Sequence, residues 1–243
     1  MPERAIDLNL EIERITAPAN LSEIAYEAIK ESLLKMELYR PPNEGRLDER
    51  ELAFRLGISR TPLREAIHRL VSEGFLKVIP RKGIYLVKKS TREIVEILIV
   101  RAALEGMAAR LATRYISEDD LRKMRAIFSP FDPETVKGHS LKYSDANIRF
   151  HEIVLQISQC GKLIELASNL FDHIRWIRFR AAAFRERHGD TLLEHLKIIE
   201  AMEMRDADLA EKRMRTHIEN LAHYVEEKGE FFLDNIRSGG STP

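Results

Sequence analysis

Apolar side chains recur at helical spacing through one short basic segment, LGISRTPLREAIHRL at residues 56–70. The positions i, i+3, i+4 and i+7, which form one buried face of a helix, are Leu63, Ala66, Ile67 and Leu70. Ser59 is a residue type that caps helices, and Pro62 is tolerated in a first turn because the amides there have no helical partners. The pattern predicts a helix whose outward side chains are Arg60, Thr61, Arg64 and His68.

The segments on either side of this helix complete a recognisable order of elements. One helix is predicted from about Ser22 through AYEAIKESLLKM, and a second over DERELAFRL, with Gly57 as its stop. After Gly74 the apolar period changes, and the β-rich runs FLKVIP and IYLV are joined by the short connection Arg81-Lys82-Gly83. Helix, helix, tight turn, helix and hairpin together predict a winged helix-turn-helix.

The rest of the chain has only helical patterning, and no phosphate-binding glycine loop interrupts it. The predicted helices are roughly 91–115, 118–128, 140–159, 162–185, 190–205 and 207–234, with Ser117 and Asp206 as caps. The fold class is therefore mostly α: an N-terminal winged helix-turn-helix of three helices plus a β-hairpin, and a C-terminal all-α bundle of about six helices. The expected divisions are a flexible arm at 1–20, a DNA-binding domain at 21–88, an all-α domain at 89–236 and a flexible tail at 237–243.

Charge adds the first functional information. The whole chain has a formal net charge of +0, yet residues 55–92 hold ten basic and two acidic side chains, a local charge of +8. The remainder must carry the opposite charge, which indicates one module that faces a polyanion and one that does not.

Composition also bears on where the protein works. No apolar run is long enough to span a bilayer, and MPERAIDLNLEIERITAPAN lacks the apolar centre of a signal peptide. A single cysteine, Cys160, excludes a disulfide within the chain. These features predict a cytoplasmic protein without a membrane partner.

The motif ELAFRLGISRTPLREAIHRLVSEGFL, followed by PRKGIYLV, closely resembles the DNA-binding domain of the GntR superfamily of bacterial transcription regulators. The segments VRAALEGMAARLAT, NIRFHEIV, LLEHLKIIEAM and RMRTHIENL are similar to the FCD ligand-binding domain of its FadR subfamily. The resemblance covers roughly residues 22–230. It implies a homodimer on a palindromic operator in double-stranded DNA, with the long helix 91–115 as a candidate contributor to the dimer interface.

The resemblance also implies which residues contact DNA. They are Arg50, Arg60, Thr61, Arg64, Lys82 and Gly83. Arginine near the start of a recognition helix can make a bidentate contact with guanine, and threonine and backbone amides suit phosphate. His68 lies further along the helix, where it reaches backbone or solvent.

Three of the eight histidines stand out by placement. His151 follows Asn147 by four residues, so both project from one helix face. His195 and His217 belong to two later helices, each within an inward apolar run. Three imidazoles in a bundle core would be costly unless they were hydrogen-bonded or bound to a metal.

The FCD resemblance implies that Asn147, His151, His195 and His217 form a metal site, with asparagine where aspartate is usual. A neutral carbonyl in place of a carboxylate removes one negative charge and should weaken the affinity for a divalent cation. Zinc, nickel and manganese all suit such a site. The alternative is a polar pocket in which the three histidines hydrogen-bond an organic ligand.

A metal with open positions suits a small carboxylate effector, and Arg101 in RAALEG is expected to complete that pocket. Arg175, Arg178 and Arg180 are further candidates, although their helical spacing prevents all three from facing inward.

The function predicted is a ligand-controlled transcription regulator, with repression favoured, and not an enzyme. Two alternatives use the same three histidines: a metal-dependent enzyme and a metal sensor. No carboxylate stands at a convincing spacing to act as the general base of the enzyme.

Overall fold

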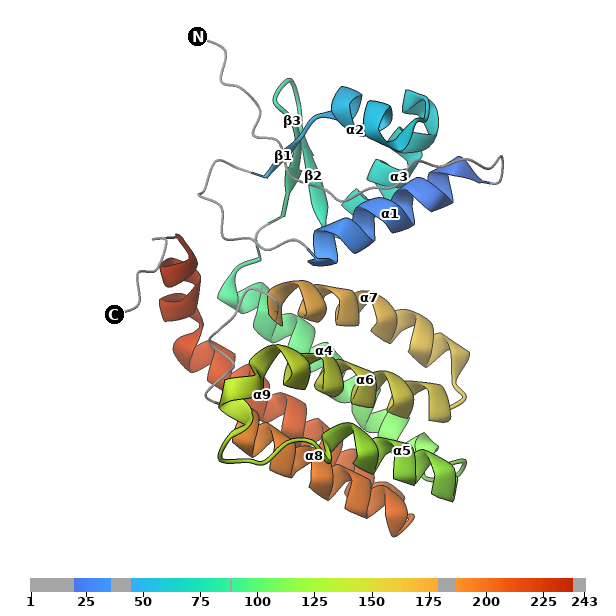
Figure 1. The fold of residues 1–243 in the computed structure, drawn as a ribbon, viewed down its shortest axis with the longest axis vertical. Coiled ribbons are helices and arrows are strands. Elements are labelled where there is room, and N and C mark those ends of the chain that lie inside the picture. The colour runs from blue at the N-terminus through green and yellow to red at the C-terminus, as the bar shows by residue number, and fades with distance from the viewer. Residues whose placement is uncertain (1–19, 36–44, 88, 179–186, 238–243) are drawn as a thin grey trace. The chain divides into compact units, whose positions relative to one another are not determined.

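The computed structural model of the protein describes residues 20–35, 45–87, 89–178 and 187–237 (Figure 1). These residues form two compact units, one that reaches Lys88 and one that spans Lys89 to Asp234. The predicted arm at the N-terminus, apart from its last residue, and nearly all of the predicted tail lie outside the described residues. No helix in the described part of the chain is both long and apolar enough to cross a membrane.

The N-terminal unit has three helices and a small sheet. The helices are α1 (Leu21–Lys35), α2 (Glu49–Leu56) and α3 (Arg60–Ser72). The strands are β1 (Arg46–Leu47), β2 (Leu76–Ile79) and β3 (Gly83–Leu86), in the antiparallel order β1-β3-β2. The three predicted helices and the hairpin are confirmed. The hairpin is extended by β1, which sequence patterning did not predict because two residues are too few to show an alternation.

The turn between α2 and α3 has the features expected of a helix-turn-helix. Asp48 caps α2 by accepting hydrogen bonds from the backbone amides of Arg50 and Glu51. Gly57 ends the helix in the left-handed region, with φ 67°, where a side chain would be strained. Ile58 follows and packs against the core of the unit. Ser59 takes the predicted N-cap position of α3, but its side chain makes no capping hydrogen bond.

The predicted apolar face of α3 is buried. Its four residues are Leu63, Ala66, Ile67 and Leu70, none more than 3% exposed. They pack in one core with apolar residues of α1, α2 and the sheet. Burial of this face holds the opposite, basic face of α3 toward solvent.

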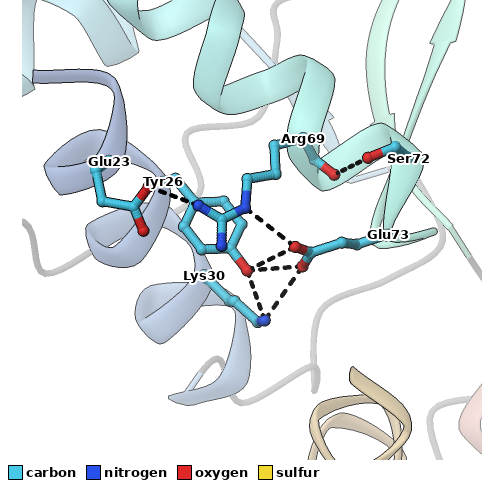
Figure 2. Close-up of polar contacts among 6 residues, drawn as sticks. All are labelled: Glu23, Tyr26, Lys30, Arg69, Ser72 and Glu73. Carbon is cyan, nitrogen blue, oxygen red and sulfur yellow. Dashed lines mark hydrogen bonds and ion pairs between the residues drawn. The ribbon is translucent and has the colours of Figure 1, made fainter. Parts of the chain in front are cut away.

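Polar contacts add a second connection between α1 and α3, shown in Figure 2. The Tyr26 hydroxyl donates to the Glu73 carboxylate at 2.7 Å, and the Lys30 ammonium donates to both groups. The Arg69 guanidinium lies 3.6 Å from the centre of the Tyr26 ring and pairs with Glu23 at 2.6 Å. This network fixes the C-terminal end of α3 against α1.

The C-terminal unit is a helical bundle. Its elements are α4 (Thr91–Ala112), α5 (Glu118–Phe128), the 3₁₀ helix η1 (Val136–His139), α6 (Ser140–Ile157), α7 (Gly161–Arg178), α8 (His188–Glu203) and α9 (Ala207–Arg237). All six predicted helices are present, and the end of the one predicted at 162–185 lies outside the described residues. Ser117 caps α5 and Asp206 caps the start of α9, as expected. Within the bundle, α4 packs against α6 and α7, and α5 packs against α6 and α8.

Candidate metal centre and nucleic-acid interface

Three helices of the bundle bring three imidazoles to one point. His151 comes from α6, His195 from α8 and His217 from α9. The Nε2 atom of His151 lies 3.3 Å from the Nε2 atom of His195 and 3.3 Å from that of His217. All three side chains are buried, with at most 2% exposed. Each offers a ring nitrogen within 4.8 Å of the others, so the group could hold a metal ion.

Each imidazole is oriented by a contact at its other ring nitrogen. His151 Nδ1 lies 2.5 Å from Glu105 Oε2, and His217 Nδ1 lies 2.7 Å from Glu194 Oε2. His195 Nδ1 lies 3.2 Å from the hydroxyl of Tyr143. A proton placed on Nδ1 of His195 or His217 is donated outward, and a proton on Nδ1 of His151 faces the Glu105 carboxylate. In each ring this leaves the Nε2 lone pair pointing to the shared centre. Histidines that bind metal in proteins are usually oriented by such contacts.

The pair Glu105 and His151 has the charge distribution that metal binding needs. Burial would raise the pKa of the Glu105 carboxyl, but Arg101 and His151 outweigh burial and hold that pKa at about 2. Burial lowers the pKa of His151 to about 4, against the attraction of Glu105. At neutral pH the carboxylate is therefore ionised and the imidazole neutral, which is the protonation state that binds a metal.

Arg101 contacts this pair from the side of Glu105. Its side chain is 1% exposed, and its Nε donates to Glu105 Oε1 at 2.5 Å. The guanidinium also lies 4.3 Å from the centre of the Phe171 ring. Arg101 thus positions Glu105, which in turn orients His151.

Asn147, expected as a fourth ligand, stands one helical turn before His151 on α6. Its side chain is 2% exposed. Its Oδ1 is buried and accepts no hydrogen bond from the residues that the structure describes. A buried carbonyl without a partner is costly, and coordination to a cation would satisfy it. Three imidazoles and one carbonyl oxygen are a donor set that fits a divalent transition metal.

A small cavity lies in the same unit. Its lining residues are Tyr143, Ser144, Asn147, Arg187, His188, Thr191 and Leu221. Tyr143 and Asn147 therefore belong both to the cavity wall and to the surroundings of the histidines.

Sequence patterning missed the residues that orient the histidines. Glu105 on α4 contacts His151 on α6. Tyr143 and Glu194 likewise contact histidines on helices other than their own. Of these three residues, only Glu105 has a signal in the local sequence, because it follows Arg101 by four residues and shares a helix face with it.

Of the other arginine candidates, Arg175 is exposed and lies 3.7 Å from Glu152, whereas the side chains of Arg178 and Arg180 lie outside the described residues.

The expected DNA-contacting residues lie at the surface of the N-terminal unit. Arg50, Arg60, Thr61 and Arg64 are exposed on α2 and α3, and Lys82 is exposed at the hairpin tip. Gly83 follows with φ 121°, a conformation that L side chains rarely adopt. Arg64 also pairs with Glu49 at 2.8 Å, which holds its side chain beside the N-terminus of α2.

Comparison with known families agrees with both units. Residues 21–86 match the bacterial regulatory proteins of the gntR family, and residues 96–220 match the FCD domain. The chain therefore belongs to the GntR family of transcriptional regulators and has an N-terminal helix-turn-helix and a C-terminal FCD domain. It is a DNA-binding regulator and not an enzyme.

Individual relatives are distant. The chain is 26% identical to the HTH-type transcriptional repressor RspR of Escherichia coli (strain K12) over 184 residues, which are 74% of this chain and 79% of the relative. It is 32% identical to the Nta operon transcriptional regulator of Aminobacter aminovorans over 136 residues, 55% of this chain and 63% of the relative.

Two solved structures share the fold. E. coli McbR/YncC has a TM-score of 0.63 at 20% identity and covers 91% of this chain and 99% of its own. A GntR protein from Rhodococcus sp. RHA1 has a TM-score of 0.68 at 16% identity and covers 86% and 99%.

Proposed function

We propose that this regulator is a homodimeric repressor whose affinity for a palindromic operator is controlled by a small carboxylate at a metal site in the FCD domain. The observation that carries the proposal is the convergence of three Nε2 atoms in a buried core. The metal ligands would be Asn147, His151, His195 and His217. Zinc, nickel and manganese fit this set, and a bound ion would supply an attachment point for an oxygen of the effector.

The DNA-binding residues proposed are Arg50, Arg60, Thr61, Arg64, Lys82 and Gly83. The proposal is supported by the exposure of all of them but the half-buried Gly83 on the N-terminal unit, and by the local charge of +8 around α3 and the hairpin. Arginine at the start of α3 would read guanine, and Lys82 would contact the backbone or the minor groove.

A dimer is proposed because one winged helix reads one half-site. Apolar side chains on α4 support it, since Ile99 is 57% exposed, Val100 49% and Met107 40%. A second copy of the chain would cover these side chains in an isologous interface. Repression is supported by RspR, a relative named as a repressor.

The proposal is tested by measuring operator binding with and without zinc and a panel of small carboxylic acids. We expect at least one acid to weaken operator binding by the zinc-loaded wild type. The variant His195→Ala should bind operator as wild type does but lose the response to the acid, because the ion that holds the acid is lost. A response to metal alone, with no effect of any acid, would show a metal sensor instead.

A further inference from the structure

The small sheet of the N-terminal unit has one face that packs on the core and one that faces solvent. Strand register places Arg46 of β1 and Lys77 of β2 opposite Tyr85 of β3, on either side of it. Directly opposite residues of neighbouring antiparallel strands project from the same face. Both basic side chains are exposed, whereas the next pair along, Leu47 and Ile84, is buried. The solvent face therefore presents a row of two cations with a tyrosine between them.

Arg46 extends this row to the turn of the hairpin. Gly83, the first residue of β3, has φ 121°, and a Cβ atom added to it would lie 3.1 Å from Arg46 Nε. The Arg46 guanidinium thus passes over the Gly83 backbone, where a larger residue would crowd it. Tyr85 braces the same turn, because its hydroxyl donates to the backbone carbonyl of Lys82 at 3.2 Å. A cation from β1 is therefore held beside the turn that joins β2 to β3.

Arg81 adds a third cation in this turn, in an unusual backbone conformation. Its φ is 62°, in the left-handed region that glycine and asparagine adopt more readily than other residues. Its side chain is exposed, so packing does not explain why an arginine occupies the position. An arginine kept at a backbone cost points to a use for its charge.

The three cations have no carboxylate partner in the part of the chain that the structure describes. In contrast, Arg64 on α3 pairs with Glu49 at 2.8 Å. Asp48, two residues after Arg46, is occupied in capping α2. The three strands and the turn contain no acidic residue. The positive charge of this face is therefore available to an anion from outside the chain.

We propose that Arg46, Lys77 and Arg81 bind phosphates of the DNA backbone beside the segment that α3 reads. All three lie within residues 21–86, which match the gntR family of regulators, so nucleic-acid phosphate is the anion that this unit meets. Contacts to phosphate carry no sequence information, but they fix the position of a protein on the duplex. The solvent face of the sheet would thus add affinity and orientation to the base contacts of α3. Neither the metal centre nor the effector is needed for this binding.

DNA titrations over a range of salt concentrations test this role, with the full chain and a fluorescent duplex of unrelated sequence, about 30 base pairs long, at about 50–200 mM salt. Each phosphate contact adds about 0.9 to the slope of log K against log salt concentration. For every protomer bound, we expect Arg46→Gln, Lys77→Gln and Arg81→Asn each to reduce the slope by about that amount, and the triple variant by about 2.7. Arg46→Lys and Lys77→Arg should keep the wild-type slope because the charge remains. Arg122→Gln, which changes an exposed arginine on α5, is the matched control.

Thermal unfolding of the same variants separates DNA binding from stability. Arg81→Asn should unfold at the wild-type temperature or higher, because asparagine tolerates the left-handed region, and it should still lose slope. The triple variant should keep the wild-type discrimination between unrelated DNA and an operator selected from random duplexes. A triple variant with the wild-type slope would overturn the proposal, as would an equal change in Arg122→Gln. Lower unfolding temperatures with an unchanged slope would show that the three residues only stabilise the hairpin.

Discussion

At the scale of single residues, the candidate metal centre depends on groups that would not bind the ion themselves. The buried series Arg101, Glu105 and His151 is joined by two contacts of 2.5 Å. Burial of these charges is tolerated because each has an opposite neighbour. The series keeps the His151 imidazole neutral and oriented so that its Nε2 atom can coordinate a metal ion.

Glu105→Gln tests this role. The amide cannot hold a charge, so His151 loses the partner that fixes its orientation and raises its basicity. We expect the affinity for Co²⁺ or Zn²⁺ to fall about 10- to 100-fold, the usual cost of losing such a partner. Titration of Co²⁺ followed by visible absorption measures it. Glu96→Gln, at an exposed position of the same helix, is the control, and equal affinities in the two variants would contradict the role of Glu105.

At this scale the sequence was informative about the histidines but not about their partners. His195 and His217 stood out because each lies within an apolar run of a predicted helix, and His151 because it follows Asn147 by one helical turn. That the three meet was implied by the FCD resemblance. Tyr143 and Glu194 were not predicted, since their contacts cross between helices and no spacing along the chain encodes them.

At the scale of secondary-structure elements, α3 and the β2–β3 hairpin present two kinds of basic residue. Arg60 stands at the first position of α3, and Lys82 at the tip of the hairpin. The buried face of α3 and its polar contacts with α1 fix the orientation of the helix (Figure 2). The outward side chains are therefore presented in a defined geometry.

Arg60→Ala and Lys82→Ala should differ in effect. Loss of Arg60 is expected to reduce discrimination between operator and unrelated DNA by about 1–3 kcal/mol. Loss of Lys82 should weaken binding to all sequences alike and reduce the salt slope by about 1. Binding to both DNAs over a range of salt concentrations measures this, with Arg122→Ala as the control. Unchanged discrimination in Arg60→Ala would exclude α3 as the base-reading helix.

Elements were largely predictable because each has a strong local period. The helix predicted at 91–115 is α4, Thr91–Ala112, and the helix predicted at 118–128 is α5 with the same bounds. The strand β1 was missed because Arg46 and Leu47 pair with Tyr85 and Ile84, which lie far along the chain. Pairing at such separation has no local pattern.

At the scale of the whole molecule, the dimer proposed above would form through the exposed apolar residues of α4. Ile99→Glu would place a charge within the proposed interface of two copies. We expect wild type to sediment as a dimer at micromolar concentration, and Ile99→Glu to sediment as a monomer with much lower operator affinity, because only one half-site is bound at a time. Monomeric wild type with full operator affinity would contradict the dimer.

The junction between the two units also bears on their coupling. It contains neither glycine nor proline, and Ser90 begins α4 with a capping box closed by Glu93. We propose that, in a dimer, a tilt of α4 is transmitted through this short junction and changes the spacing of the two recognition helices. Half-sites are read at a fixed separation, so such a change lowers affinity without loss of any base contact.

We propose that a ligand at the metal centre and the operator are coupled through this chain, and coupling of two binding sites is reciprocal. Calorimetry of the acid that weakens operator binding, performed on the zinc-loaded protein with and without operator DNA, tests it most directly. We predict that operator lowers the affinity for the acid by the same factor by which the acid lowers operator affinity, about 5- to 150-fold. Identical affinities for the acid in the two titrations would contradict this coupling.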